Sequence, residues 1–171
     1  METFAARLRG LGIGDAILAA SLGAGCLFRL IPPMRTDFPL HDGGMFYVMI
    51  EAIRREHYAL PSFIPFNGAD IPFAYPPLAF FTAAALADLT GAAALDILRF
   101  LPALMACATL VAFVVLARSL LPAKASVVVA VIAFAALPSS FSYLIVGAGL
   151  AKSFGLFLAL LALAQAVALY R

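Results

Sequence analysis

The side chains that could do chemistry gather in one stretch of the sequence, 36–77. This stretch holds most of the acidic residues, both histidines and two Gly-rich turns, whereas the segments around it are strongly apolar. The first candidate in it is Asp42, in the run His41-Asp42-Gly43-Gly44.

Asp42 has two interpretations, which the sequence leaves open. A short carboxylate before a helix is a typical N-cap, which accepts hydrogen bonds from the first turn and stabilises a helix by about 1 kcal/mol. The same position suits a catalytic residue, because the two glycines leave room for a bulky ligand to approach the backbone. A carboxylate held there can act as a general base or as a metal ligand.

Three other residues of the stretch 36–77 are weaker candidates. His41 is either a solvated residue or a substrate ligand, and Asp37, five residues before Asp42, could share a divalent cation with it, such as Mg²⁺ or Mn²⁺. Tyr75 precedes Pro76-Pro77 at the entry to a helix, where it is either an interfacial anchor or a substrate contact.

Two cations outside this stretch are further candidates for binding a substrate. Arg29 lies near the end of the first apolar segment, where it is expected to snorkel to the lipid headgroups or to contact a lipid phosphate. Lys152 follows the turn Gly147-Ala148-Gly149 at a helix start. A glycine turn, a helix N-terminus and a lysine together suit an anion, although a plain helix start with a snorkelling lysine fits equally well.

The composition indicates an integral membrane protein. Of the 171 residues 65% are hydrophobic and 12% are charged, with a mean hydropathy of +1.07, whereas soluble domains are about half apolar and a quarter charged. The net charge of +2 includes no basic run, which argues against nucleic-acid binding. Cys26 and Cys107 lie in apolar segments and are interpreted as small buried hydrophobic residues.

The elements that must position the candidates are membrane-spanning helices, so the predicted fold is an all-α polytopic membrane protein. We predict one membrane module over 1–171 with about four spans. The first is 13–31, ended by Pro32-Pro33. The others are 97–117, 125–141 and 154–170, joined by a cytoplasmic loop, 118–124, and by a second external loop, 142–153.

The long external loop, 32–95, is predicted to contain two helices that lie along the membrane surface. The first is about 42–58, because Phe46, Met49, Ile50 and Ile53 fall on one face and Glu51 and Arg55 form an i,i+4 pair. The second is about 76–90, which is too short for a typical span. Between them, 61–75 is predicted to be irregular because of its prolines and Asn67-Gly68.

Topology follows from the basic residues. With four spans, Arg118 and Lys124 share a side with both ends of the chain, and the positive-inside rule makes that side cytoplasmic. If 76–90 crossed the membrane, both residues would move outside. The first segment also faintly resembles a cleavable lipoprotein signal ending at Cys26, but its apolar run continues past that cysteine, which favours a retained span.

This order of elements, with FPLHDGGMFYVMI followed by IPFAYPPLAFF, resembles the N-terminal module of the GT-C superfamily of membrane glycosyltransferases. That superfamily includes oligosaccharyltransferase catalytic subunits, protein O-mannosyltransferases and aminoarabinose transferases, and the run looks like uncharacterised bacterial members. The resemblance covers roughly 13–170 and is most specific around Asp42 and at Tyr75-Pro76-Pro77-Leu78.

The resemblance implies transfer of a sugar from a polyprenyl-phosphate-linked donor on the extracytoplasmic face of a prokaryotic plasma membrane. By position, Asp42 would activate the acceptor or help bind a metal. The chain departs from the family in two respects. Its second external loop has no acid, and it has fewer spans, so we expect a fragment of a longer chain or a shortened relative that needs a partner subunit.

Two other functions compete with this interpretation. One is a non-catalytic membrane module that binds lipid or a partner subunit, in which Asp42 only caps a helix. The other is half of a transporter, which is disfavoured because no span has an acid at its middle or an unwound Gly/Pro break.

Overall fold

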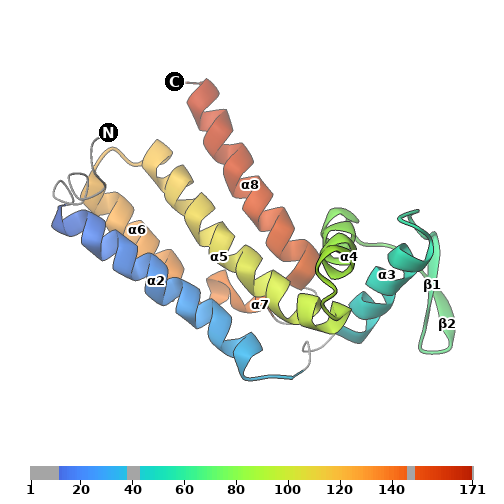
Figure 1. Ribbon diagram of the computed structural model, residues 1–171. Helices are drawn as coiled ribbons and strands as arrows, with labels where there is room; N and C mark the ends of the chain where they lie inside the picture. Colours follow the sequence, from blue (N-terminus) through green and yellow to red (C-terminus); the bar gives the residue numbers. More distant parts are fainter. Residues whose placement is uncertain (1–11, 38–42, 146–148, 171) are drawn as a thin grey trace, which may run out of the picture.

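The computed structural model describes residues 12–37, 43–145 and 149–170. Within them the chain is mostly helical, with one two-stranded hairpin (Figure 1). In chain order the elements are α2 (Ile13–Met34), α3 (Gly43–Arg55), β1 (Phe63–Phe66), β2 (Ala69–Pro72), α4 (Leu78–Thr90), α5 (Ala94–Leu120), α6 (Lys124–Ala136), the 3-10 helix η1 (Pro138–Ser140), α7 (Ser142–Ile145) and α8 (Gly149–Leu169).

Three helices, α2, α5 and α8, are long and apolar enough to cross a membrane, which supports the expectation of an integral membrane protein. They run lengthwise through the molecule, and α5 packs against α2, α6 and α8 (Figure 1). Among the described residues a fourth crossing exists only if α6 and the bent segment after it are counted together. The helices of two predicted spans begin earlier than the spans, because α5 begins before residue 97 and α8 begins before residue 154.

The elements α3, β1, β2 and α4 form a small layer at one end of the long helices, which we call the head (Figure 1). Its core is built from the apolar face of α3, including Phe46 and Ile50, and from Phe80 and neighbouring alanines of α4. Leu98 of α5 and Leu150 of α8 belong to the same buried cluster. The head is therefore packed directly on the first turns of α5 and α8.

The region 61–75 is a β-hairpin rather than the predicted irregular loop. Strand β1 pairs antiparallel with β2, with Phe66 opposite Ala69. Asn67 and Gly68 both have positive φ, 53° and 78°, as a two-residue hairpin turn of the Asn-Gly type requires. The prolines fit because both strands of a two-stranded ribbon are edges, where a missing N–H is tolerated.

Helix α2 does not end at Pro32-Pro33 as predicted but continues to Met34. A proline removes its own N–H from the helical ladder. Two prolines in the last turn therefore remove few hydrogen bonds. The N–H of Arg35 still donates to the carbonyl of Ile31 and closes the helix.

The predicted span 125–141 is broken in two. Helix α6 ends at Ala136, and the segment Pro138–Ile145 turns away from it by 84°. At 1.5 Å per residue the 13 residues of α6 cover about 20 Å, less than the ~30 Å hydrocarbon thickness of a bilayer. The predicted second external loop, 142–153, contains α7 and the first residues of α8. Its side of the membrane stays a prediction.

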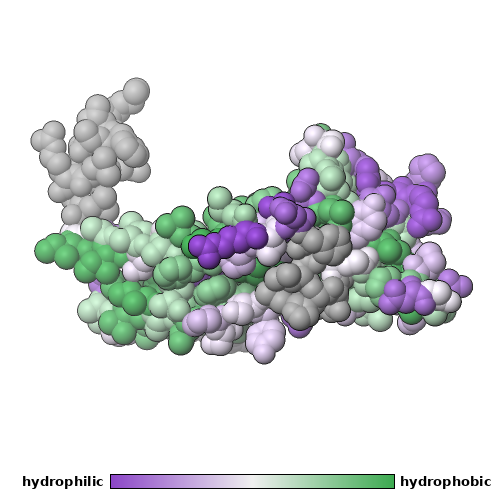
Figure 2. All heavy atoms as spheres, turned by 90° about the horizontal axis from the view of Figure 1, so that it is seen from below, coloured by the Kyte–Doolittle hydropathy of each residue, from purple (hydrophilic) through white to green (hydrophobic). Residues whose placement is uncertain are grey.

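The surface of the molecule separates by polarity along its length. On the face seen in Figure 2, hydrophobic side chains cover most of the long helices and hydrophilic ones gather toward the head. Exposed large apolar residues on the spans include Leu27, Val111, Val115 and Leu163. This distribution is typical of helices that face lipid, with a head outside it.

Candidate functional site

The two leading candidates, His41 and Asp42, lie outside the residues that the structure describes. The described residues that border this segment are Asp37, after the end of α2, and Gly43, the first residue of α3. We therefore built the candidate site from its described surroundings, where α2 ends and α5 and α8 begin.

Arg99, in the second turn of α5, links these surroundings to α2. Its Nε donates a hydrogen bond of 2.7 Å to the carbonyl oxygen of Pro33. Its guanidinium lies 3.9 Å from the Asp96 carboxylate and 4.0 Å from that of Asp37. Both ion pairs are longer than a direct charge-assisted hydrogen bond, about 2.7–2.9 Å, so Arg99 keeps donors available for an anion.

Asp37 was predicted to share a metal ion with Asp42. In the structure its side chain is fully exposed and its nearest charged partner is Arg99. Among residues 12–37, 43–145 and 149–170 no group of three or more His, Cys, Asp or Glu side chains is placed to hold a metal ion. The predicted sharing of a metal ion by Asp37 and Asp42 stays a prediction, because Asp42 lies outside the described residues.

Tyr75 lies in the packing of the head. Its ring is 5.0 Å from the ring of Phe46, edge to face, and 6.1 Å from that of Phe80. Aromatic pairs in this geometry add about 0.5–1.5 kcal/mol beyond the area that they bury. Tyr75 therefore helps to fix α3 against α4.

Lys152 is exposed in the first turn of α8. The residues on both sides of it in the helix, Leu150 and Phe154, pack against the core of the head. Lys152 is thus held where the head meets the spans. Gly147 and Ala148 of the expected anion-binding turn lie outside the described residues.

Arg29 does not snorkel to the headgroups as expected, because it is fully buried. Its Nη1 donates to the carbonyls of Gly25 (2.9 Å) and Ala135 (3.2 Å), and its Nη2 donates to the carbonyl of Phe134 (3.3 Å) and to Ser140 Oγ (3.1 Å). It therefore binds the last carbonyls of α6, at the break in the chain.

The charge of Arg29 is stabilised without a carboxylate partner among the described residues. The guanidinium carbon lies 4.6 Å from the centre of the Phe141 ring, and a ring face attracts a cation. The C-terminus of α6 also carries the negative end of its dipole, which favours a cation there. Only Nε, which is buried, lacks a hydrogen-bond partner in the described part of the chain.

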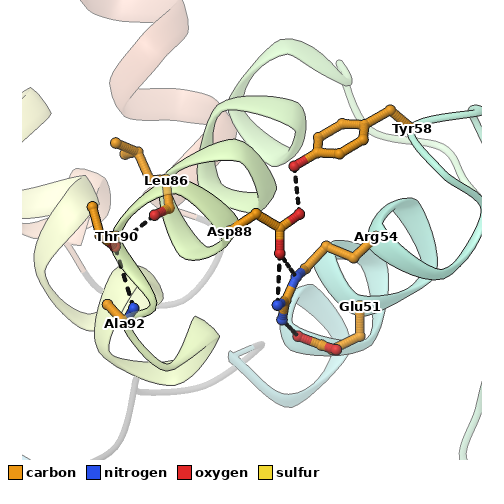
Figure 3. Close-up of polar contacts among 7 residues, drawn as sticks. All are labelled: Glu51, Arg54, Tyr58, Leu86, Asp88, Thr90 and Ala92. Carbon is orange, nitrogen blue, oxygen red and sulfur yellow. Dashed lines mark hydrogen bonds and ion pairs between the residues drawn. The ribbon is translucent and has the colours of Figure 1, made fainter.

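A polar cluster joins the two helices of the head (Figure 3). Asp88 of α4 accepts hydrogen bonds from Arg54 Nε (2.7 Å) and from the Tyr58 hydroxyl (2.6 Å). Arg54 also pairs with Glu51, in place of the expected pair between Glu51 and Arg55. The hydrogen bond from Tyr58 and then the one from Arg54 hold the pKa of the Asp88 carboxyl below its ordinary value, and Asp88 in turn raises the pKa of Tyr58.

This cluster is a structural link rather than a candidate active site. Both carboxylates are paired, and the backbone at His57 and Tyr58 has positive φ, 51° and 65°. This turn ends α3 and directs the Tyr58 side chain to Asp88 (Figure 3). The cluster fixes α3 on α4, and thus the position of Gly43 on the head.

Comparison of the chain with protein-family models, with curated proteins and with solved structures finds no match.

Sequence reasoning missed Arg99, Asp88 and Ser140. Arg99 carried a usable signal, because a cation one turn into an apolar helix is costly in a membrane unless it has a partner or a function. Asp88 stands near the end of the predicted helix 76–90, and the residues around it give no signal of a role. Its partners are 30 and 34 residues away in the chain, a separation that no local pattern specifies.

Proposed function

We propose that this chain is the N-terminal module of a GT-C-like glycosyltransferase, which moves a sugar from a polyprenyl-phosphate-linked donor to an acceptor on the extracytoplasmic face. One observation carries the proposal. The segment between the first two long helices is folded into a head that packs on the starts of α5 and α8, the position that the resemblance implies for an external catalytic loop.

The proposal includes a four-span topology in which α6 and the bent segment after it form the third crossing. The short connection 121–123 then lies in the cytoplasm between Arg118 and Lys124, as the positive-inside rule favours. The N-terminus is cytoplasmic, and α3 and α4 lie along the outer surface of a prokaryotic plasma membrane. The hairpin turn at Asn67-Gly68 is then outside.

In this proposal Asp42 is the acid/base residue and precedes the fixed N-terminus of α3. Arg99 and Lys152 supply positive charge for the donor phosphate, since both lie where the head meets the spans and Arg99 is only loosely paired. Asp37 is close enough to Arg99 to pair with it when no donor is bound. A bound donor phosphate would then compete with Asp37 for the Arg99 guanidinium. A divalent metal at Asp42 would neutralise the same phosphate charge.

The test of the chemistry is Asp42→Asn, with Asp70→Asn in the hairpin as control. The purified protein in proteoliposomes is given a panel of polyprenyl-phosphate hexoses and pentoses, together with a cell extract that supplies the acceptor, and acceptor-dependent release of polyprenyl phosphate is measured. Asparagine caps a helix as well as aspartate does, so the unfolding temperature should stay unchanged. Loss of a general base should lower the rate by about 10²–10⁴-fold. Transfer at the unmodified rate in Asp42→Asn would contradict this role.

The test of the topology uses two cysteines introduced outside the spans, Asn67→Cys and Pro122→Cys. A maleimide that cannot cross membranes should label the first from outside intact cells and the second only after permeabilisation. Unmodified protein gives the background from Cys26 and Cys107, which lie half-buried in α2 and α5. Labelling of both introduced cysteines from one side would reject the four-span arrangement.

The second candidate is a non-catalytic membrane module that binds lipid or a partner subunit. It is favoured by the exposed apolar faces of the spans, with Leu158 and Leu163 of α8 among the outward residues. Here Asp42→Asn should keep function, and the chain should be recovered from the membrane together with a partner or with bound lipid.

A further inference from the structure

A pocket of about 350 Å³ opens at the end of the bundle opposite the head. It lies between the start of α2, the end of α5 and the start of α6. Three charged residues line it, Asp15, Arg118 and Lys124, together with apolar side chains that include Leu18, Leu121 and Val128. The pocket thus combines charge with an apolar wall.

The one carboxylate in the pocket is already neutralised. Lys124 Nζ lies 2.7 Å from Asp15 Oδ2, and the same oxygen accepts a hydrogen bond from the N–H of Gly12 at 3.1 Å. The Lys124 side chain reaches Asp15 across Gly14, where an added Cβ would be 3.3 Å from Lys124 Cε. Because Gly14 has no side chain, the Lys124 side chain can pass over it to Asp15.

Among the described residues, Arg118 is the cation of the pocket that has no partner. It is exposed, and among the described residues its side chain makes no hydrogen bond or ion pair. With Asp15 and Lys124 compensating each other, the pocket keeps one net positive charge.

The helix ends around the pocket add to this positive character. Both α2 and α6 begin here, so two helix N-termini contribute partial positive charge and unpaired N–H groups. The N-cap of α6 is Ala123, which has no side chain to accept a hydrogen bond from the first turn. The negative end of α5 lies here too, and it cancels about one of these two partial positive charges.

We infer that this pocket binds the phosphate of an anionic phospholipid from the leaflet opposite the head. The position at the ends of the apolar helices places the charges at headgroup depth, and Leu18 and Val128 offer an apolar surface to the first acyl carbons. Cationic pockets between spans on the cytoplasmic side are suited to such headgroups. The inference rests on membrane insertion and not on the glycosyltransferase proposal.

The experiment measures lipid retained by the full chain in native mass spectrometry from nanodiscs of phosphatidylglycerol mixed with phosphatidylcholine. We expect the unmodified protein to retain phosphatidylglycerol in preference. Arg118→Gln should lower that retention about fivefold, since one cation near the surface contributes about 1 kcal/mol. Arg35→Gln, an exposed arginine after the other end of α2, is the matched control and should have no effect.

Arg118→Gln removes no interaction that the described residues make, so its fold should be intact, and the unfolding temperature checks this. Lys124→Gln is the second variant. It should lower retention further, since it leaves the Asp15 carboxylate facing the phosphate. Equal retention of the two lipids, or no effect of Arg118→Gln, would overturn the inference. Displacement of the lipid by millimolar inorganic phosphate would instead assign the site to a free anion, and also overturns it.

Discussion

Arg29 on α2 donates a hydrogen bond of 3.2 Å to the carbonyl of Ala135, in the last turn of α6, 106 residues further along the chain. This contact lies inside the helix bundle, where no exposed surface of Arg29 remains. It supplies a partner to carbonyls that the early end of α6 leaves without one. The break after α6 therefore frees carbonyl groups that Arg29 can bind, and these hydrogen bonds stabilise the buried charge of Arg29.

The first prediction is that Arg29→Gln destabilises the protein. Hydrogen bonds to a charged group contribute about 1.5–3 kcal/mol. The variant removes the arginine donor from the Ala135 carbonyl and leaves the Phe134 carbonyl with Ser140 Oγ alone. We expect a clear fall in the unfolding temperature in detergent. It is measured by near-UV circular dichroism of the tyrosine and phenylalanine side chains, since the chain has no tryptophan. Arg35→Gln, at an exposed arginine, should leave it unchanged. An Arg29→Gln protein as stable as the parent would show that Arg29 does not stabilise the break after α6.

The second prediction compares two glycines of α2. A Cβ at Gly25 would lie 2.7 Å from Leu110 Cδ2 and 3.0 Å from Ala135 Cβ, whereas at Gly23 it would meet nothing within 4 Å. Overpacking costs about 1–3 kcal/mol, so Gly25→Ala should separate α2 from α5 and α6 and lower the unfolding temperature. Gly23→Ala should be neutral or slightly stabilising. Equal effects of the two substitutions would contradict this packing of α2.

The third prediction concerns acid stability of the head. The folded state lowers the pKa of Asp88, mainly through Tyr58 and then Arg54. The stability that Asp88 contributes is therefore present above the unfolded carboxyl pKa of about 3.9 and is lost as the pH falls through its lower folded value. The measurement is a curve of unfolding temperature against pH. In Asp88→Asn this curve should fall less steeply than in the parent between about pH 5 and 2. Asp70→Asn is the control, and should keep the curve of the parent.

The same link predicts a change at high pH. The pKa of Tyr58 is raised, chiefly by its hydrogen bond to Asp88. Its contribution is therefore complete below the unfolded tyrosine pKa of about 10 and is lost above it. Tyr58→Phe should remove that loss, and a spectrophotometric titration should then lack one tyrosine that ionises above the ordinary tyrosine pKa. An unchanged titration would mean that Tyr58 does not bond to Asp88.

The fifth prediction tests the hairpin. Gly68 has φ 78°, a conformation that costs a residue with a side chain roughly 1–2 kcal/mol. Gly68→Ala should therefore loosen the region 61–75 and speed its cleavage in limited proteolysis. Gly155→Ala, in open space within α8, should not. Protection of 61–75 in Gly68→Ala equal to that in the parent would argue against the paired strands.

The helices of this chain were largely predictable from its pattern. The apolar runs predicted spans at 13–31, 97–117 and 154–170, which α2, α5 and α8 contain or largely overlap. The apolar face of Phe46, Met49 and Ile50 predicted α3, and all three are buried in the head. Such patterns are local, because the side-chain period of a helix is fixed by its own geometry.

The candidate site was predictable only in part. Lys152 and Asp37 lie near the junction of the head and the spans, but Tyr75 is packed inside the head and Arg29 is buried against α6. Arg99, which joins α5 to the end of α2, was not foreseen. Each of these outcomes depends on which distant element lies next to the side chain, and the hydropathy of the neighbouring residues does not contain that information.

The sequence by itself therefore determined that this is a helical membrane protein with a polar segment between its first two long helices, because hydropathy and helical period act over a few turns of chain. Only the tertiary structure decided that the chain bends by 84° after α6 and that Arg29 is buried. The reason is energetic. A buried cation and a broken span are each unfavourable alone, and they become stable only when the fold brings Arg29 to the carbonyls of α6.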